Sequence, residues 1–219
     1  AQLLVFPAVG TRKAVAILGA RYAGVLVRDG WAPYRKLSHA THQTCLAHLL
    51  RRTHGLLETA QRGPVRFPHA VRRLLLRTLA RRARRDRGEL GDHGLRGALG
   101  RVEAATDRLL AGRGAYPPNR HLLRHLRTER LALFPCVRRA DVEATNWQAE
   151  QAIRPAVVTR KGCGGNRSPR GAATQEIVAS VLRISVQQHR DPLVLLVAPQ
   201  RSPRPIVADL RLRGPAPPT

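Results

Sequence analysis

Two carboxylates, Asp29 and Glu150, are the residues of this sequence best placed to do chemistry. Asp29 follows an apolar run at residues 25–27 that predicts a β-strand, so it would lie at the carboxyl edge of a sheet, where open α/β folds place their sites. Glu150 follows Thr145 and Gln148, whose spacing predicts a capped helix start. Carboxylates on adjacent strand and helix ends can hold a pair of Mg²⁺ ions that activate water against a phosphodiester.

Spacing alone favours a simpler interpretation of the same two residues. Asp29 can cap the turn into Gly30, because short acidic side chains hydrogen-bond to the backbone of such turns. Glu150 can be a solvated helix residue. The long helical segment between them would have to be an insertion for the two carboxylates to meet.

Cys45 and His48 form another candidate pair, because residues three apart share one face of a helix. With His42 or Cys136 nearby they could be half of a zinc site, which in structural sites takes four ligands at short paired spacings. No second pair of this kind completes the set, so buried packing or a hydrogen-bonded histidine is the favoured interpretation, and no metal is predicted there. The three cysteines are far apart, which predicts that all are reduced.

A glycine-rich basic segment spans residues 160–170, RKGCGGNRSPR. Its cations are Arg160, Lys161, Arg167 and Arg170. Exposed backbone N–H groups and arginines bind phosphates, so contact with a DNA backbone is the preferred interpretation. The segment lacks the ordered spacing of a nucleotide-binding loop, and a solvated connector stays an alternative. The arginines between residues 72 and 87 fit a second phosphate track or the wet face of an amphipathic helix equally well.

Composition points to a polyanionic partner. Lys and Arg number 39 against 14 Asp and Glu, which gives a formal charge of +25, far more than solubility requires. Nearly all of these cations are arginines, whose planar fork suits bidentate contact with phosphate oxygens, although GC-rich coding gives the same bias. No long apolar run and no charged leader occurs, so neither a membrane span nor secretion is predicted, and the cytoplasm is the default location.

The elements that must position these residues divide the chain into three parts and a tail. The predicted divisions are 1–44, 45–134, 135–195 and a proline-rich tail at 196–219. The first part is predicted as strand, helix and strand, with the first strand at 2–6 and the helix at 11–20. The second part has apolar residues at helical spacing and predicts four helices.

The third part is predicted to be α/β-like and to begin near Val137. Its first helix would start at the capping box at Thr145, place Glu150 in its second turn, and kink or end at Pro155. A basic loop at 161–171 and a helix at about 172–188 would follow. The prolines of the last residues predict an extended tail.

Three segments of the sequence together resemble transposases of the insertion sequence 66 family. They are GVLVRDGWAPY at residues 24–34, THQTCLAHLLRR at residues 41–52, and ATNWQAEQAIRPAVVTRKGCGGNRSPRGAATQ at residues 144–175. Their order and the helical gap before the third segment also match, so the resemblance covers nearly everything up to about Pro192.

The resemblance implies an α/β, ribonuclease-H-like fold interrupted by a mostly helical insertion, with an Asp, Asp, Glu triad that holds Mg²⁺ or Mn²⁺. Asp29 matches the second aspartate and Glu150 matches the glutamate, while Cys45 and His48 match a signature whose role is architectural. DNA, as transposon ends and target, is the implied partner. The predicted DNA-binding residues are Arg154 and the cations of the basic segment, Arg160, Lys161, Arg167 and Arg170.

Two departures from the family pattern stand out. The family shows two asparagines before the glutamate segment and an arginine after it, whereas Asn146 is followed here by Trp147 and Glu150 by Gln151. The first aspartate of the triad would precede Ala1, since residues 1–28 contain no Asp or Glu. The chain is therefore expected to be a piece, truncated at the amino end, that is inactive or nearly so by itself.

The implied activity of the whole enzyme is two-metal hydrolysis at transposon ends, followed by strand transfer into target DNA. Such an enzyme is expected to act as a homo-oligomer on DNA, in the bacterial cytoplasm at the nucleoid. The main alternative is a non-catalytic DNA-binding remnant of a decayed transposase. A basic structural protein of a ribonucleoprotein is a third interpretation, which would require the three matching segments to be accidental.

Overall fold

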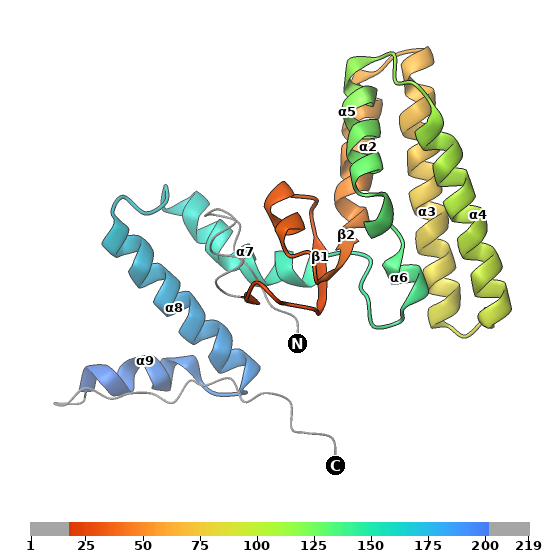
Figure 1. The fold of residues 1–219 in the computed structure, drawn as a ribbon. Helices are drawn as coiled ribbons and strands as arrows, with labels where there is room; N and C mark the ends of the chain where they lie inside the picture. The colour runs from red at the N-terminus through yellow and green to blue at the C-terminus, as the bar shows by residue number, and fades with distance from the viewer. Residues whose placement is uncertain (1–17, 202–219) are drawn as a thin grey trace. The chain divides into compact units, whose positions relative to one another are not determined.

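The structure, a computed structural model, describes residues 18–201 and divides the chain into two units, residues 1–148 and 149–219. The described part is mostly helical, with a small sheet in the first unit (Figure 1). No described helix combines the length and apolarity needed to cross a bilayer. The strand predicted at 2–6 and most of the helix predicted at 11–20 lie outside the described residues.

The sheet consists of two parallel strands, β1 (Val25–Arg28) and β2 (Thr41–Thr44), in register from Val25 opposite Thr41 to Arg28 opposite Thr44. The 3₁₀ helix η1 (Ala32–Lys36) lies in the connection between them. The backbone of Cys45 donates to the Arg28 carbonyl at 2.7 Å, so the pairing with β1 continues one residue beyond the carboxyl end of β2. β1 confirms the predicted strand, while the full ribonuclease-H-like sheet stays a prediction.

The next four helices form an up-and-down bundle, as the helical spacing predicts (Figure 1). They are α2 (Leu46–Thr59), α3 (Arg66–Asp86), α4 (Asp92–Ala111) and α5 (Pro117–Thr128), with the 3₁₀ turn η2 (Gly63–Val65) before α3. Proline at the first positions of α5 suits a helix start, because its missing N–H would have no partner there. The bundle buries one stripe of each helix in a common core that includes Leu49, Leu75, Val102, Leu122 and Leu126.

The chain returns from the bundle to β2 through η3 (Arg130–Ala132) and the short helix α6 (Pro135–Arg138). Gln43 of β2 fixes this return: its Oε1 accepts from the Cys136 N–H at 2.8 Å, and its Nε2 donates to the Leu133 carbonyl at 3.3 Å. The bundle is therefore anchored on the sheet at its end as well as at its beginning.

The second unit contains α7, whose first residues belong to the first unit, then α8 and α9. Their bounds are Trp147–Gly162, Pro169–Gln187 and Pro192–Arg201. α8 packs against α9. The hydroxyl of Ser168 accepts from the Gly171 N–H at 3.1 Å and caps the start of α8.

Several predictions for this region need correction. The third part is predicted to be α/β-like, but its described residues form the helices α6 to α9 and no strand, because their apolar residues continue at helical spacing. The residue before α7 is Asn146, an equally good cap, rather than Thr145, so Glu150 lies in the first turn and not the second. Of the two outcomes predicted for Pro155, it does not end α7, which continues to Gly162, while a kink at Pro155 stays a prediction; the missing backbone donor costs one hydrogen bond, which the remaining turns tolerate.

The predicted loop and tail are correspondingly shorter. Arg160 and Lys161 lie in the last turn of α7 and Arg170 in the first turn of α8, which leaves residues 163–168 as the loop. Residues 196–201 belong to α9 instead of an extended tail, because the apolar residues before them continue as a helix. Residues 202–219 lie outside the described part.

Candidate active site

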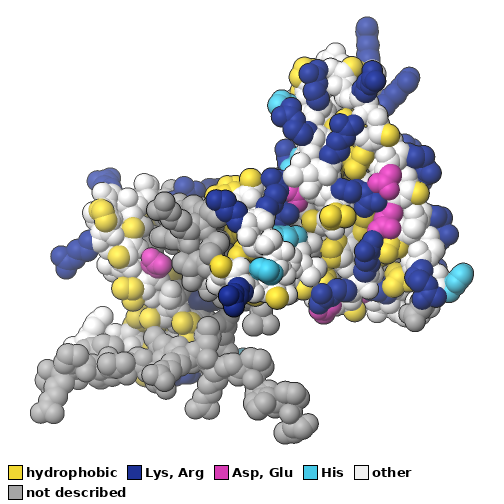
Figure 2. Space-filling view, in the orientation of Figure 1, with side chains coloured by type: hydrophobic (Ala, Val, Ile, Leu, Met, Phe, Trp, Pro, Cys, Tyr) yellow, Lys and Arg dark blue, Asp and Glu magenta, His cyan; other side chains and the backbone are white. Residues whose placement is uncertain are grey.

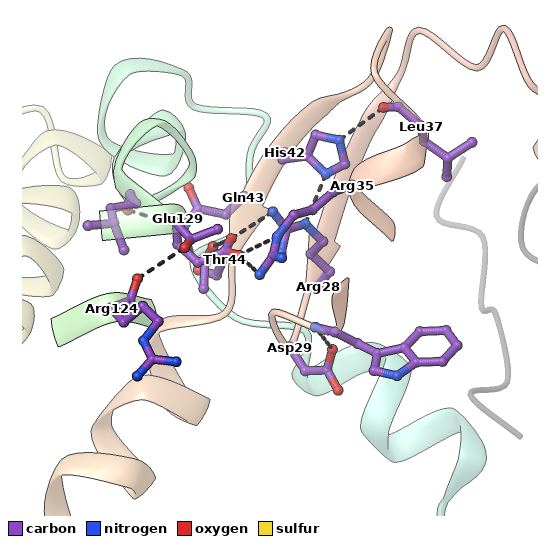
Figure 3. A network of polar contacts seen from close by, with 12 residues as sticks. Arg28, Asp29, Arg35, Leu37, His42, Gln43, Thr44, Arg124 and Glu129 are labelled. Atoms are coloured by element: carbon purple, nitrogen blue, oxygen red, sulfur yellow. Dashed lines mark hydrogen bonds and ion pairs between the residues drawn. The ribbon is translucent and has the colours of Figure 1, made fainter. Parts of the chain in front are cut away.

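Asp29 follows directly after β1, at the carboxyl edge of the sheet (Figure 3). Its Oδ1 accepts from the Trp31 N–H at 2.9 Å, and Gly30 between them has φ +90°, a conformation that glycine adopts without a steric penalty. Asp29 is exposed, whereas the preceding Arg28 is only 4% exposed, because alternate residues of a strand face opposite sides. The turn therefore presents one carboxylate outward at the strand end. Asp29 therefore caps the turn, as its spacing to Gly30 predicts, and at the same time exposes its carboxylate.

A buried carboxylate, Glu129 directly after α5, pairs with the residue that precedes this turn. Oε2 of Glu129 is 2.6 Å from Nη2 of Arg28 and accepts from the Thr44 hydroxyl at 2.8 Å. Oε1 accepts two hydrogen bonds from Arg35, at 3.0 and 2.8 Å. Figure 3 shows these side chains of β1, β2 and η1 gathered around the one carboxylate.

The environment of Glu129 decides its protonation. Burial by itself raises the pKa of the Glu129 carboxyl, but the hydrogen bonds from Arg28, Thr44 and Arg35 outweigh it and hold the pKa below its ordinary value. Glu129 is therefore charged, and its one negative charge is shared by the two guanidinium groups of Arg28 and Arg35.

His42 of β2 extends this network with a defined tautomer. Its Nδ1 accepts from Nε of Arg28 at 2.9 Å, so its Nε2 carries the proton that is donated to the Leu37 carbonyl, also at 2.9 Å. Burial is the main cause that lowers the pKa of His42, and the charge of Arg28 acts in the same direction. The ring is neutral and helps to fix Arg28.

His125 of α5 reaches the same turn from the bundle. A Cβ atom on Gly30 would lie 2.6 Å from Cε1 and 2.9 Å from Nε2 of His125, so the ring packs directly on the glycine backbone. Nε2 of His125 and Nη1 of Arg28 are buried without a hydrogen-bond partner among the described residues. Burial, followed by the charge of Arg52, lowers the pKa of His125.

Cys45 and His48 have a local, structural arrangement. Cys45 is fully buried as the residue before α2, and its sulfur accepts from the Asn146 N–H at 3.4 Å. Burial raises the pKa of the Cys45 thiol, but the hydrogen bonds with His48 and Asn146 bring it below its ordinary value. No group of three or more potential metal ligands exists among the described residues, and all three cysteines are free.

The hydrogen bond between Cys45 and Asn146 fixes the path of the chain just before the helix that carries Glu150. The Leu46 N–H donates to the Ala144 carbonyl at 2.9 Å, so residues 144–146 run beside the start of α2. That start is also where the Cys45 N–H joins the carboxyl end of β1. The chain thus enters α7 from the sheet edge that carries Asp29.

Glu150 itself is exposed in the first turn of α7. It belongs to residues 149–219, whereas Asp29 belongs to the other unit, so the convergence of the two carboxylates stays a prediction. The candidate DNA-binding cations of this region, all exposed, are Arg154, Arg160, Lys161, Arg167 and Arg170.

The arginines at 72–87 divide into two groups. Some are internal or paired: Arg82 binds Glu143 at 2.9 Å, and Nη1 of Arg85 donates to the carbonyls of Cys136 and Val137 at 2.8 and 2.9 Å. Those on the outer face of α3, Arg72, Arg73 and Arg77, are exposed. Figure 2 shows Lys and Arg side chains spread over the visible face of the bundle with few acids among them.

The network around Glu129 was not predicted from the sequence. Glu129 is the single acid in a run of basic residues, a signal that resembles an ordinary surface position. The alternation of β1, which buries Arg28, implies a buried counter-charge, but the sequence does not say which acid provides it.

The comparisons with known proteins agree with the motif resemblance. A family model described as "Transposase IS66 family" matches residues 2–174, a range that includes Asp29, Glu150 and the basic segment. No curated protein and no solved structure matches the chain.

Proposed function

The chain belongs to the IS66 family of transposases, and we propose that it serves metal-dependent cleavage and strand transfer of DNA, with Asp29 and Glu150 as metal-binding carboxylates. The family implies a transposition-related function and DNA as the partner. The alternative of a remnant that only binds DNA has no specific observation in its favour.

One observation carries this proposal: residues 144–146 run beside the sheet edge that carries Asp29. The hydrogen bonds from Leu46 to Ala144 and from Asn146 to Cys45 define that path. The family match includes both acids and supports assigning them to one site.

The donor atoms fit Mg²⁺ or Mn²⁺ in chemical type. Asp29 uses one oxygen for the Trp31 N–H, so its other oxygen is a hard ligand at an exposed strand end. Glu150 offers a second exposed carboxylate. Such ions, when bound, polarise the phosphodiester and activate the attacking water or hydroxyl.

The other residues of the chain would position the metal ligands and the DNA. Glu129 pairs with Arg28 and Arg35 and so offsets part of the positive charge near the Asp29 turn, which otherwise would disfavour a bound cation. The exposed cations of α7 and the following loop would hold DNA phosphates without reading sequence. We further propose that the protein acts as a homo-oligomer on DNA, at the bacterial nucleoid.

Iron-mediated backbone cleavage tests the shared metal site without requiring turnover. Fe²⁺ replaces Mg²⁺ at oxygen sites, and radicals formed there with ascorbate and peroxide cut the nearby backbone. We expect cuts next to both residue 29 and residue 150. Asp29→Asn and Glu150→Gln should each remove both cuts, because each deletes a ligand of the same ion.

The matched control is Asp107→Asn, which removes an exposed carboxylate that pairs with Arg130 on the bundle. It should leave both cuts intact. Cutting at one position only, or cuts that persist in both substituted chains, would contradict a shared site.

A further inference from the structure

The last turn of α5 holds the residues on both sides of Asp29. Glu129 binds Arg28, which precedes the aspartate, and His125 packs on Gly30, which follows it. His125 and Glu129 are one helical turn apart, since the Glu129 N–H donates to the His125 carbonyl at 2.9 Å. One rigid helix end therefore contacts the chain before and after the candidate catalytic carboxylate.

We propose that this turn is a clamp by which the helical bundle sets the orientation of Asp29, with His125 and Glu129 as positioning residues. The role of Asp29 in catalysis rests on the proposed function, whereas the contacts that form the clamp do not depend on it. The clamp assigns the bundle a part in organising the catalytic carboxylate in addition to any contact with DNA.

The contacts of Glu129 make this end of the clamp stiff. A buried carboxylate that accepts from two arginines and a threonine has one low-energy arrangement, because any shift leaves a buried charge unpaired. Arg28 is fixed from a second direction by His42, so its backbone, and with it the start of the Asp29 turn, has little freedom.

The contact of His125 defines the other end. Gly30 has φ +90°, and the ring of His125 occupies the space that a side chain would need. Its Nε2, which faces the glycine, makes no hydrogen bond among the described residues, so no hydrogen bond from this atom explains the position of the ring. Close packing against the glycine backbone is therefore the function that its position supports, and it limits how far the Asp29–Trp31 turn can open.

Amide hydrogen exchange of Trp31, measured by NMR, is the direct test of the clamp. This N–H donates to Oδ1 of Asp29 and reports the turn without any metal or DNA. We expect His125→Ala and Glu129→Gln to accelerate its exchange at least about tenfold, the effect of a local opening. The matched control His121→Ala removes an exposed histidine one turn earlier on α5 and should change nothing.

A double substitution gives a second test that does not depend on one variant. A Cβ atom at Gly30→Ala would collide with the His125 ring, so Gly30→Ala should lower the urea midpoint less in the His125→Ala chain than in the wild type. The strain of φ +90° is the same in both chains and cancels in this comparison. Equal shifts in both backgrounds, or unchanged Trp31 exchange in a folded His125→Ala chain, would overturn the clamp.

Manganese binding separates this inference from the proposed function. In electron paramagnetic resonance titrations, His125→Ala should weaken Mn²⁺ binding about tenfold while its unfolding midpoint stays near that of the wild type, a result that a purely structural residue would not give. If Asp29→Asn leaves Mn²⁺ binding unchanged, the proposed metal site fails, and Trp31 exchange still decides the clamp.

Discussion

Nη2 of Arg28 lies 2.6 Å from Oε2 of Glu129, and this buried ion pair joins the strand that precedes Asp29 to the residue that follows the last helix of the bundle. Residues distant in sequence thus form one polar centre at Arg28, the residue directly before the candidate catalytic carboxylate. The stability of the centre and the chemistry beside it are therefore linked.

Loss of the Glu129 charge should destabilise the fold strongly. Glu129→Gln leaves the buried Arg28 without its counter-charge, and removing one partner of a buried pair typically costs about 3–5 kcal/mol. Urea unfolding followed by circular dichroism measures the effect. Asp107→Asn, which breaks an exposed pair, should cost less than about 1 kcal/mol, and an equal cost for the two would contradict the account.

The same carboxyl predicts the direction of acid sensitivity. The pKa of Glu129 is lower in the folded chain than its ordinary value of 4.5, so the unfolded chain binds its proton first. The stabilisation is complete above about pH 4.5 and is lost as the pH falls toward the lowered folded pKa. Unfolding free energies from pH 6 to pH 3 should fall less steeply for Glu129→Gln than for the wild type.

His42 should be neutral, with its proton on Nε2. Nitrogen NMR shifts distinguish the tautomers directly, and lowering the pH should leave the ring neutral below the ordinary histidine pKa of 6.5, because burial lowers its folded pKa. The linked stability is present above pH 6.5 and decreases as the pH falls below it. A proton on Nδ1 at neutral pH would contradict the hydrogen bond from Arg28.

The three thiols should react at very different rates. Cys163 is exposed, whereas Cys45 and Cys136 are buried, and burial raises the pKa of Cys136 to about 11. A thiol reagent at pH 8 should modify one cysteine at once and the other two only in denaturant. Rapid modification of Cys45 would show that its contact with Asn146 opens.

The cations after Glu150 should carry much of the salt-dependent DNA binding. Replacing Arg160, Lys161, Arg167 and Arg170 with alanine should lower the slope of log affinity against log salt by up to about 3.6, if each neutralises one phosphate. A control that replaces Arg84, Arg87, Arg138 and Arg139, which already pair with acids, should change the slope less. An equal decrease of the slope in both variants would contradict a specific role for the cations after Glu150 and would indicate that the overall positive charge attracts DNA.

The sequence predicted the elements whose apolar spacing is strong and missed those built on polar contacts. β1 and the four bundle helices follow from runs such as residues 25–27 and the spacing of Leu122 and Leu126. β2 has the polar sequence THQT, and its burial depends on partners such as Glu129 and Cys136, which local patterns do not reveal.

The site was predictable only in part for the same reason. Asp29 was identifiable because it follows a clear strand and lies in a family motif. His125 and Glu129 carry no local signal, since their roles come from α5 returning to the sheet. At Pro155 the local rule allowed either a kink or an end, and the turns on either side continue the helix past it.

Thiol crosslinking between positions 29 and 150 tests the central claim most directly. Two carboxylates on one Mg²⁺ ion bind at about 2.1 Å, which places their oxygens within roughly 4 Å of each other. In a Cys163→Ser background, Asp29→Cys with Glu150→Cys should be joined within one chain by a short bismaleimide, while Asp29→Cys with Glu176→Cys on α8 should not. Failure of the first pair to crosslink in a folded chain would contradict a shared site for Asp29 and Glu150.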